Sequence, residues 1–268
     1  MVYLDMERET VVEQKLEQTP WTLRQTLLGT FFTLVPWIIL ALSLASLNGK
    51  PTQSHRLSPQ TDLASAIIVF LFSVLVEGAF LIAPFYFARR TAPTFNIGED
   101  QPRSIFYELG FRHFQWLPTL GMIVLLFLAF YLVNGFYQYI ITVFHLNLQT
   151  NDQVILQQSK DAPFTTYATL IASVLVAPIC EETFFRGFVF AGFLNRMPVA
   201  IAIVLSSFLF AIAHADLGSF AVLFFIGLAL AFVRWRTRSL WPGILLHLLN
   251  NGVGAIVIIL VMTGVLRQ

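Results

Sequence analysis

The sequence predicts an all-α fold, a polytopic integral membrane bundle of about seven transmembrane helices. Of its 268 residues, 57% are hydrophobic and only 12% are charged, whereas soluble domains are about 45–50% apolar and about 25% charged. The excess is gathered into long apolar runs, and a run of about 20 apolar residues is what a helix needs to cross a bilayer. The lipid bilayer is therefore the first expected partner. Nucleic acid is not expected, because no basic stripe exists outside the loops.

Seven apolar segments follow one another along the chain, roughly at residues 26–47, 64–88, 117–145, 164–190, 198–214, 218–233 and 240–262. The first contains Pro36, which kinks a membrane helix without forbidding it. Residues 199–233 are almost continuously apolar and are broken only by HADLGS. The fifth and sixth segments are therefore expected to form either two short spans or a re-entrant pair.

The polar segments divide the chain into four parts. We expect a polar cytoplasmic segment at 1–25, N-terminal transmembrane helices at 26–160, a core at 161–262 and a tail at 263–268. The loop at 89–115 is predicted to be interfacial, and its stretch SIFYELGFRHFQW can lie flat as an amphipathic helix. The N-terminus has no basic region before an apolar core, so no cleavable signal peptide is expected.

The distribution of lysine and arginine predicts the orientation. If the N-terminus is cytoplasmic, eleven Lys and Arg residues fall on inside segments and four fall outside. Cytoplasmic loops of membrane proteins carry the excess of these residues. We therefore expect the N-terminus inside and the C-terminus outside, in a plasma (inner) membrane or an internal membrane.

Charged residues within an apolar run identify the first candidate site, in EETFFRG at residues 181–187. Ionisable groups in a bilayer core cost about 2.5–3.5 kcal/mol each on insertion scales, so they persist where they pair or do chemistry. Glu182 and Arg186 are four apart and can pair on one helical face, as a structural ion pair or as support for a site. Glu181 is less well matched by local charge and is the candidate general base.

Two later segments each bring a polar pair at helical spacing. In FLFAIAH, Phe210 and His214 are four apart, so Phe210 can wall one side of a pocket that His214 faces. In HLLNN, His247 and Asn251 are four apart, and both can donate to an oxyanion or to a neighbouring helix. Side chains that converge from several helices are how bundles build sites. A carboxylate, a water, a histidine and oxyanion donors together suit hydrolysis of an amide.

EETFFR, FAIAH and HLLNN, in this order over about residues 165–255, resemble the CPBP family of membrane proteases, which includes the type II CAAX prenyl proteases and the bacteriocin-processing, Abi-like proteins. Its pattern is EExxxR, FxxxH and then HxxxN or HxxxD, and YELGFR at 107–112 also resembles the approach to its core. The resemblance implies an intramembrane endopeptidase acting on a peptide or protein substrate at the membrane, with residues 161–262 as the protease core.

Carried onto this chain, the resemblance gives each motif residue a role. Glu181 would activate the attacking water with help from His214, and His247 and Asn251 would stabilise the tetrahedral oxyanion. The supporting residues would be Glu182, Arg186 and Phe210. The family is often labelled a metalloprotease, and Glu181, His214 and His247 would make a His₂Glu zinc set with one open position. HExxH is absent, and we favour the metal-free mechanism while zinc stays open as the alternative cofactor.

Other readings of the polar residues remain. The same fold without catalysis would be a membrane immunity or scaffold protein. A transporter using the polar set as a proton relay is disfavoured, because no inverted repeat is visible. Glu77, in FSVLVEGAFL, is expected to bond to Asn134 or Gln138 or else to face the cavity. Cys180 is expected to be an inert small hydrophobe.

Overall fold

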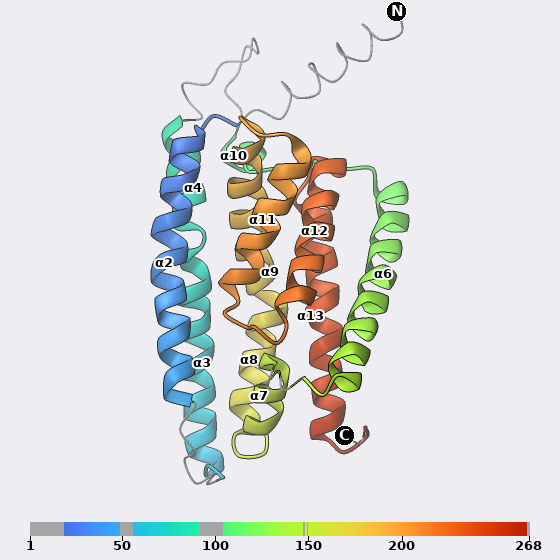
Figure 1. The fold of residues 1–268 in the computed structure, drawn as a ribbon. Coiled ribbons are helices and arrows are strands. Elements are labelled where there is room, and N and C mark those ends of the chain that lie inside the picture. Colours follow the sequence, from blue (N-terminus) through green and yellow to red (C-terminus); the bar gives the residue numbers. More distant parts are fainter. Residues whose placement is uncertain (1–18, 49–55, 92–103, 147, 149, 267–268) are drawn as a thin grey trace, which may run out of the picture.

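A computed structural model describes residues 19–48, 56–91, 104–146, 148 and 150–266 of the protein (Figure 1). Every regular element among these residues is helical. Six helical segments are long and apolar enough to cross a membrane: Leu23–Leu44, Pro59–Thr91, Trp116–Val143, Pro163–Leu194, Phe220–Thr237 and Trp241–Met262. The predicted all-α polytopic bundle is confirmed.

Successive long helical segments run in alternating directions along the bundle (Figure 1). The first half contains α2 (Leu23–Asn48), α3 (Pro59–Ala79), α4 (Ile82–Thr91), the single turn α5 (Ile105–Glu108), α6 (Trp116–Val143) and α7 (Asn151–Gln158). The second half contains α8 (Pro163–Leu175), α9 (Ala177–Glu182), the π-helix η2 (Thr183–Phe190), α10 (Ala191–Leu194), α11 (Val199–Ala213), α12 (Phe220–Thr237) and α13 (Trp241–Met262).

The α11–α12 hairpin differs from the other connections. α11 has 15 residues, which is about 22 Å of helix, against about 30 Å for a hydrocarbon core. The turn between α11 and α12 lies part-way along the bundle and not at either end (Figure 1). The long apolar stretch at 199–233 is therefore a hairpin that returns to the end from which it started, and its turn carries His214.

Phenylalanines of η2 form the centre of the core. Phe184, Phe185, Phe188 and Phe190 are all fully buried. Phe80, at the junction of α3 and α4, packs edge-on against Phe184 with ring centroids 5.2 Å apart. All eight residues of η2 are buried, so this segment is surrounded by the other helices on every side. The residues directly before it are consequently held deep in the bundle.

Asp62 ties the start of α8 to α3. Its carboxylate accepts hydrogen bonds from the backbone N–H of Phe164 at 2.8 Å and from the N–H and hydroxyl of Thr165 at 3.0 and 2.7 Å. The first N–H groups of a helix have no partner within the helix, and here a neighbouring helix supplies it. This cap sets where α8 begins and thereby the position of the α9 carboxylates that follow.

The helix expected over SIFYELGFRHFQW extends only over Ile105–Glu108. Gly110 follows with φ 99°, a left-handed conformation that ends helices. Its carbonyl accepts from the N–H of Leu240 at 2.8 Å, and the Arg112 carbonyl accepts from the Ser239 hydroxyl at 2.6 Å. The segment is therefore held against the α12–α13 connection. The preceding part of the predicted interfacial loop, at 92–103, lies outside the described residues.

Candidate active site

Three elements bring Glu181, His214 and His247 together. Glu181 is in α9, His214 is the C-cap of α11 and His247 is in the second turn of α13. Glu181 Oε2 lies 3.9 Å from His214 Nε2 and 3.9 Å from His247 Nε2. The side chains of His214 and Glu181 are 25% and 12% exposed, whereas that of His247 is 4% exposed. The cluster is thus reached from the His214 side.

Glu182 holds the far side of His247. Its Oε1 is 3.1 Å from His247 Nδ1 and accepts a hydrogen bond from Arg186 Nη1 at 2.8 Å. Arg186 Nη2 also donates to the carbonyl of Gly227 on α12 at 3.1 Å. Both charged side chains are fully buried, and a buried charge is tolerated only when it is paired and hydrogen-bonded. The ion pair predicted from the spacing of Glu182 and Arg186 is present, and the contact of Glu182 with His247 is an addition to it.

A π-helix begins directly after these carboxylates, at Thr183. π-helical turns are rare and frequently occur at functional sites. Each turn of a π-helix holds more residues than a turn of an α-helix, which lets successive bulky side chains face different neighbours. Here Phe184 and Phe185 enter the core while Arg186 turns back to Glu182.

Phe210 is the shared wall of the cluster. Its ring centroid is 4.6 Å from that of His214 and 5.7 Å from that of His247. Arg186 Cζ lies 4.3 Å above the same ring, a distance at which a cation is attracted to the aromatic face. Phe210 is 1% exposed, so it separates the histidines from the core and fixes their spacing.

The hydrogen-bond partners determine which nitrogen of each histidine carries a proton. His214 Nδ1 is 2.8 Å from the Phe210 carbonyl oxygen, which can only accept, so Nδ1–H is the donor. His247 Nδ1 faces the Glu182 carboxylate, and the same inference holds there. In its neutral form each ring therefore presents the lone pair of Nε2 towards Glu181. Each can donate from Nε2 only when it is protonated on both nitrogens.

Asn251 is engaged with α8. Its Nδ2 donates to the Ser173 carbonyl at 2.9 Å, and its Oδ1 accepts from Asn250 Nδ2 at 3.2 Å. It stands one turn after His247 on α13. Among the described residues, it makes no hydrogen bond to Glu181 or to either histidine of the cluster. Of the predicted site residues, Asn251 is the one that the structure leaves outside the contact set.

Glu77 is on α3, which packs against α8 and α9. The expected bond to Asn134 or Gln138 is wrong, because both are on α6, which runs along the opposite side of the bundle from α3 (Figure 1). The Glu77 Oε2 atom is buried and has no hydrogen-bond partner among the described residues.

Two residues that no sequence motif identifies also contact the surroundings of the cluster. Trp37 of α2 donates from its indole N–H to the Ala213 carbonyl at 2.5 Å, directly before His214. Gly243 of α13 faces Glu182, and a Cβ at this position would lie 3.1 Å from Glu182 Oε2. Both contacts join residues that are far apart in the chain, so no local spacing reveals them.

The zinc alternative finds no support in the geometry. Throughout the part of the chain that the structure describes, no group of three or more His, Cys, Asp or Glu side chains is arranged to hold a metal ion. This applies to Glu181, His214 and His247, the set that the sequence offered for zinc.

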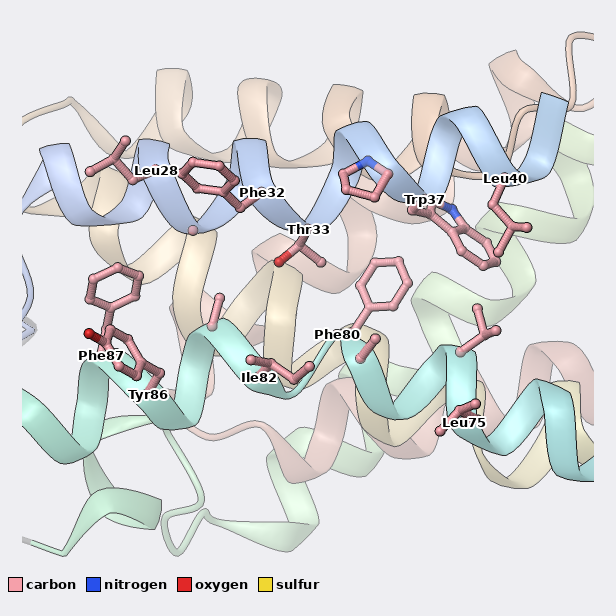
Figure 2. Close-up of a pocket in the computed structure, with 15 residues that line it drawn as sticks. Leu28, Phe32, Thr33, Trp37, Leu40, Leu75, Phe80, Ile82, Tyr86 and Phe87 are labelled. Atoms are coloured by element: carbon pink, nitrogen blue, oxygen red, sulfur yellow. The ribbon is translucent and has the colours of Figure 1, made fainter. Parts of the chain in front are cut away.

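An apolar cavity of about 550 Å³ lies between α2 and the α3–α4 pair. Figure 2 shows side chains of both elements directed into it, among them Trp37 and Phe80. These two rings pack edge-on with centroids 5.4 Å apart. They also contact the cluster's surroundings, since Trp37 bonds to Ala213 and Phe80 packs on Phe184. Trp37 and Phe80 thus line the cavity and also contact residues close in the chain to His214 and to the α9 carboxylates.

The region of the chain that forms the cluster is similar to known proteins. Residues 163–253 match the family model of the type II CAAX prenyl endopeptidases, Rce1-like. The chain is 34% identical over 101 residues to the "Putative membrane peptidase YdiL" of Bacillus subtilis (strain 168), a match that covers 38% of this chain and 40% of that protein. It is 30% identical over 144 residues to an "Uncharacterized protein" of Mycoplasma capricolum subsp. capricolum, which covers 49% of this chain and 41% of that protein.

The matched region contains the whole cluster. The chain spans about two fifths of the length of the curated relatives it matches. No solved structure was found to match it. Glu181, His214, His247 and Asn251 all lie within residues 163–253. The similarity to the Rce1-like type II CAAX prenyl endopeptidase model therefore lies in the part of the chain that contains the cluster.

Proposed function

We propose that the protein is an integral-membrane endopeptidase that hydrolyses a peptide bond of a membrane-associated or lipidated peptide. The observation that carries the proposal is the equal separation of 3.9 Å between Glu181 Oε2 and the Nε2 atoms of His214 and His247. These distances are too long for direct hydrogen bonds and suit polar groups bridged by one water. A water held there touches a carboxylate and a histidine at once.

The reaction would use Glu181 as the general base. The water gives one proton to Glu181, and its oxygen bonds to the carbonyl carbon of the scissile peptide. His214 orients the water by accepting its second hydrogen at Nε2. When the tetrahedral intermediate collapses, the C–N bond breaks and the amine nitrogen takes the proton from Glu181. General bases of this kind typically contribute about 10²–10⁴-fold to the rate.

His247 would stabilise the oxyanion. Because its Nδ1–H is directed at Glu182, its Nε2 donates only in the doubly protonated form. Asn251 would add the Nδ2 hydrogen that is not bonded to Ser173. Buried donors of this type are worth about 10²–10³-fold each in acyl-transfer enzymes.

The apolar cavity supports a hydrophobic substrate. At about 550 Å³ it falls in the range of about 300–1,000 Å³ typical of small-molecule pockets. The hydrocarbon chain of a lipidated peptide would lie there while the peptide bond reaches Glu181 past Trp37 and Phe80. Prenylated peptides, which the family name indicates, are the first substrates to try.

The test is cleavage of fluorogenic peptides, with and without a lipid group, by the protein purified in detergent. Glu181→Gln should lower kcat/KM by about 10²-fold or more, with thermal unfolding unchanged and with wild-type activity insensitive to a chelator. Asp161→Asn makes the same acid-to-amide change outside the cluster and serves as the control. Loss of activity on chelation would support the zinc mechanism instead. Equal background cleavage by wild type and Glu181→Gln would favour a non-catalytic immunity or scaffold protein.

A further inference from the structure

The turn between α11 and α12, at residues 214–219, carries His214 and has an irregular backbone. It lies part-way along the bundle (Figure 1). Within it Ala215 has φ 49°, a left-handed conformation that residues other than glycine seldom adopt. Irregular backbone at membrane depth is tolerated only where the protein or a water-filled cavity satisfies its polar groups. The turn therefore requires hydrogen-bond partners from its surroundings.

The carboxylate of Asp216 bonds to two of these backbone groups. Its Oδ1 accepts from the N–H of Ser219 at 3.0 Å, within the same turn. Its Oδ2 accepts from the N–H of Asn151 at 2.9 Å, at the first residue of α7. Asp216 is 7% exposed. One buried carboxylate thus closes the turn on itself and fastens it to a helix from an earlier part of the chain.

The start of α7 has a cap of its own. The Thr150 hydroxyl accepts from the Gln153 N–H, and the Gln153 side chain accepts from the Thr150 N–H, which together form a capping box. This pair does not use the N–H of Asn151, which is directed to Asp216 instead. The contact is therefore an addition to a helix start that is already capped, and its consequence is to fix the turn relative to α7.

Two further helices hold the same turn. The Tyr137 hydroxyl of α6 donates to the Gly218 carbonyl at 2.7 Å, and the Trp37 indole of α2 donates to the Ala213 carbonyl. A strained backbone conformation, such as that of Ala215, persists only where the surrounding structure determines it. The contacts from α2, α6 and α7 lie on both sides of His214 and provide that determination.

The place of His214 Nε2 depends on where this turn is held. Because His214 Nδ1 bonds to the Phe210 carbonyl of its own helix, the ring orientation relative to α11 is set. The 3.9 Å separation of Nε2 from Glu181 Oε2 then depends on the position of the end of α11. The His214 side chain is 25% exposed, so packing around the ring does not by itself enclose it.

We propose that Asp216 is a positioning residue for His214. Its two hydrogen bonds hold the α11–α12 turn so that His214 Nε2 keeps its place beside Glu181. Small misplacements of a catalytic group have large effects on rate. The inference rests on the proposed function, since the exact place of His214 matters for cleavage only if this cluster hydrolyses the peptide bond.

Asp216→Asn tests the role directly. Asparagine is similar in size but has one acceptor oxygen in place of two, so one of the two N–H groups loses its partner. We expect kcat to fall about tenfold, with KM within about twofold of wild type because the substrate cavity is untouched. Asp152→Asn is the control. It removes an exposed carboxylate next to Asn151 that makes no hydrogen bond among the described residues, and it should leave kcat unchanged.

Asn151→Pro removes the same hydrogen bond from the other partner and leaves Asp216 intact. Proline has no N–H and is well tolerated at the first position of a helix. The preceding Thr150 has φ −97° and ψ 157°, the extended conformation that a residue before proline prefers. The variant should therefore fold and show the same fall in kcat as Asp216→Asn. Asn151→Ala retains the N–H and should keep the wild-type kcat.

A chemical measurement reports on His214 without any cleavage. Diethyl pyrocarbonate modifies neutral imidazole nitrogens, and mass spectrometry locates the modified residue. In Asp216→Asn and Asn151→Pro the modification of His214 should be about fivefold faster, because one lost hydrogen bond makes opening of the turn easier by about that factor. His247, which is 3% exposed, should react at the wild-type rate in both variants.

Three results would overturn the proposal. One is a folded Asn151→Pro protein with the kcat and the His214 reactivity of wild type. Another is an equal fall in kcat for Asp216→Asn and Asp152→Asn, which would assign the effect to charge and not to the two hydrogen bonds. The third is a lower unfolding temperature with unchanged kcat, which would make Asp216 a purely structural residue. If wild type cleaves no peptide, the proposed function fails, and the His214 labelling still decides whether Asp216 holds the turn.

Discussion

The carboxylate of Glu182 has two tasks. Its Oε1 accepts from Arg186 and faces Nδ1 of His247, so one oxygen neutralises a buried cation and sets the orientation of an imidazole. A histidine whose second nitrogen is held by a carboxylate keeps one tautomer and one ring orientation. A small displacement of Glu182 should therefore be felt at His247 Nε2, which faces Glu181.

Gly243→Ala tests whether the position of the Glu182 carboxylate matters, because it adds a single methyl group beside it. The new Cβ would lie 3.1 Å from Glu182 Oε2, closer than an ordinary van der Waals contact, so the carboxylate must shift away from it. Small misplacements of catalytic groups have large kinetic effects, and we expect kcat/KM to fall on the order of tenfold. The measurement is peptide cleavage alongside thermal unfolding.

The matched control is Gly254→Ala on the same helix, where a Cβ meets nothing within 4 Å. That change should leave the rate unaltered and raise stability slightly, because alanine is the better helix former by about 1 kcal/mol. Equal rates for Gly243→Ala and wild type would show that the position of Glu182 is not critical.

For single side chains, the sequence predicts contacts only between residues that are close together in the chain. The pairing of Glu182 with Arg186 was predictable because four residues separate them on one helix. The contact of Glu182 with His247 joins residues 65 positions apart, and its formation depends on how α13 packs against α9. Local periodicity contains no information about that packing.

Trp37 links two elements, α2 and the end of α11. Its indole donates to the carbonyl of Ala213, one of the last carbonyls of α11, which have no partner within the helix. His214 follows directly. The hydrogen bond thus holds the turn that carries His214 against α2, at the wall of the apolar cavity (Figure 2).

Trp37→Phe should loosen that turn. Phenylalanine retains an aromatic ring beside Phe80 but has no donor, and a hydrogen bond of this kind contributes about 1 kcal/mol. If the loss is expressed at His214, kcat falls about fivefold. Trp21→Phe is the control, because the Trp21 indole donates to the Phe188 carbonyl at 3.3 Å in the core. That variant should lose stability and keep its kcat, and a similar fall in kcat for both would argue against a specific role of Trp37.

The sequence predicts that the helices exist but not how deep each lies or which type of helix it forms. The existence of seven apolar segments follows from composition, and each is helical in the structure. The depth of the α11–α12 turn does not follow, because an apolar run is the same at any depth. The π-helical geometry of η2 does not follow either, because its sequence TFFRGFVF is too short and too uniformly apolar to show a period. Both features lie beside the buried phenylalanines of η2, which pack against α11 and α12.

The whole bundle has one basic end. α4 and α12 end where α2 begins (Figure 1), and their last turns contain Arg89 and Arg90, and Arg234 and Arg236. The described chain finishes at the opposite end (Figure 1). Basic residues near the ends of spans are retained on the cytoplasmic side. We therefore expect the end of the bundle that carries these arginines to face the cytoplasm and the opposite end, where the described chain finishes, to face outwards.

Labelling of single cysteines can test this orientation, because the chain has one cysteine and it is buried. Cys180 is 5% exposed, so the unmodified protein should react little with a membrane-impermeant maleimide. Val265→Cys places a thiol at a position that is 69% exposed, and Arg196→Cys places one in the exposed connection after α10. In intact cells of a bacterial expression host, the reagent should label Val265→Cys at once and Arg196→Cys only after permeabilisation. The reverse pattern would invert the bundle, and the basic end would then face outwards.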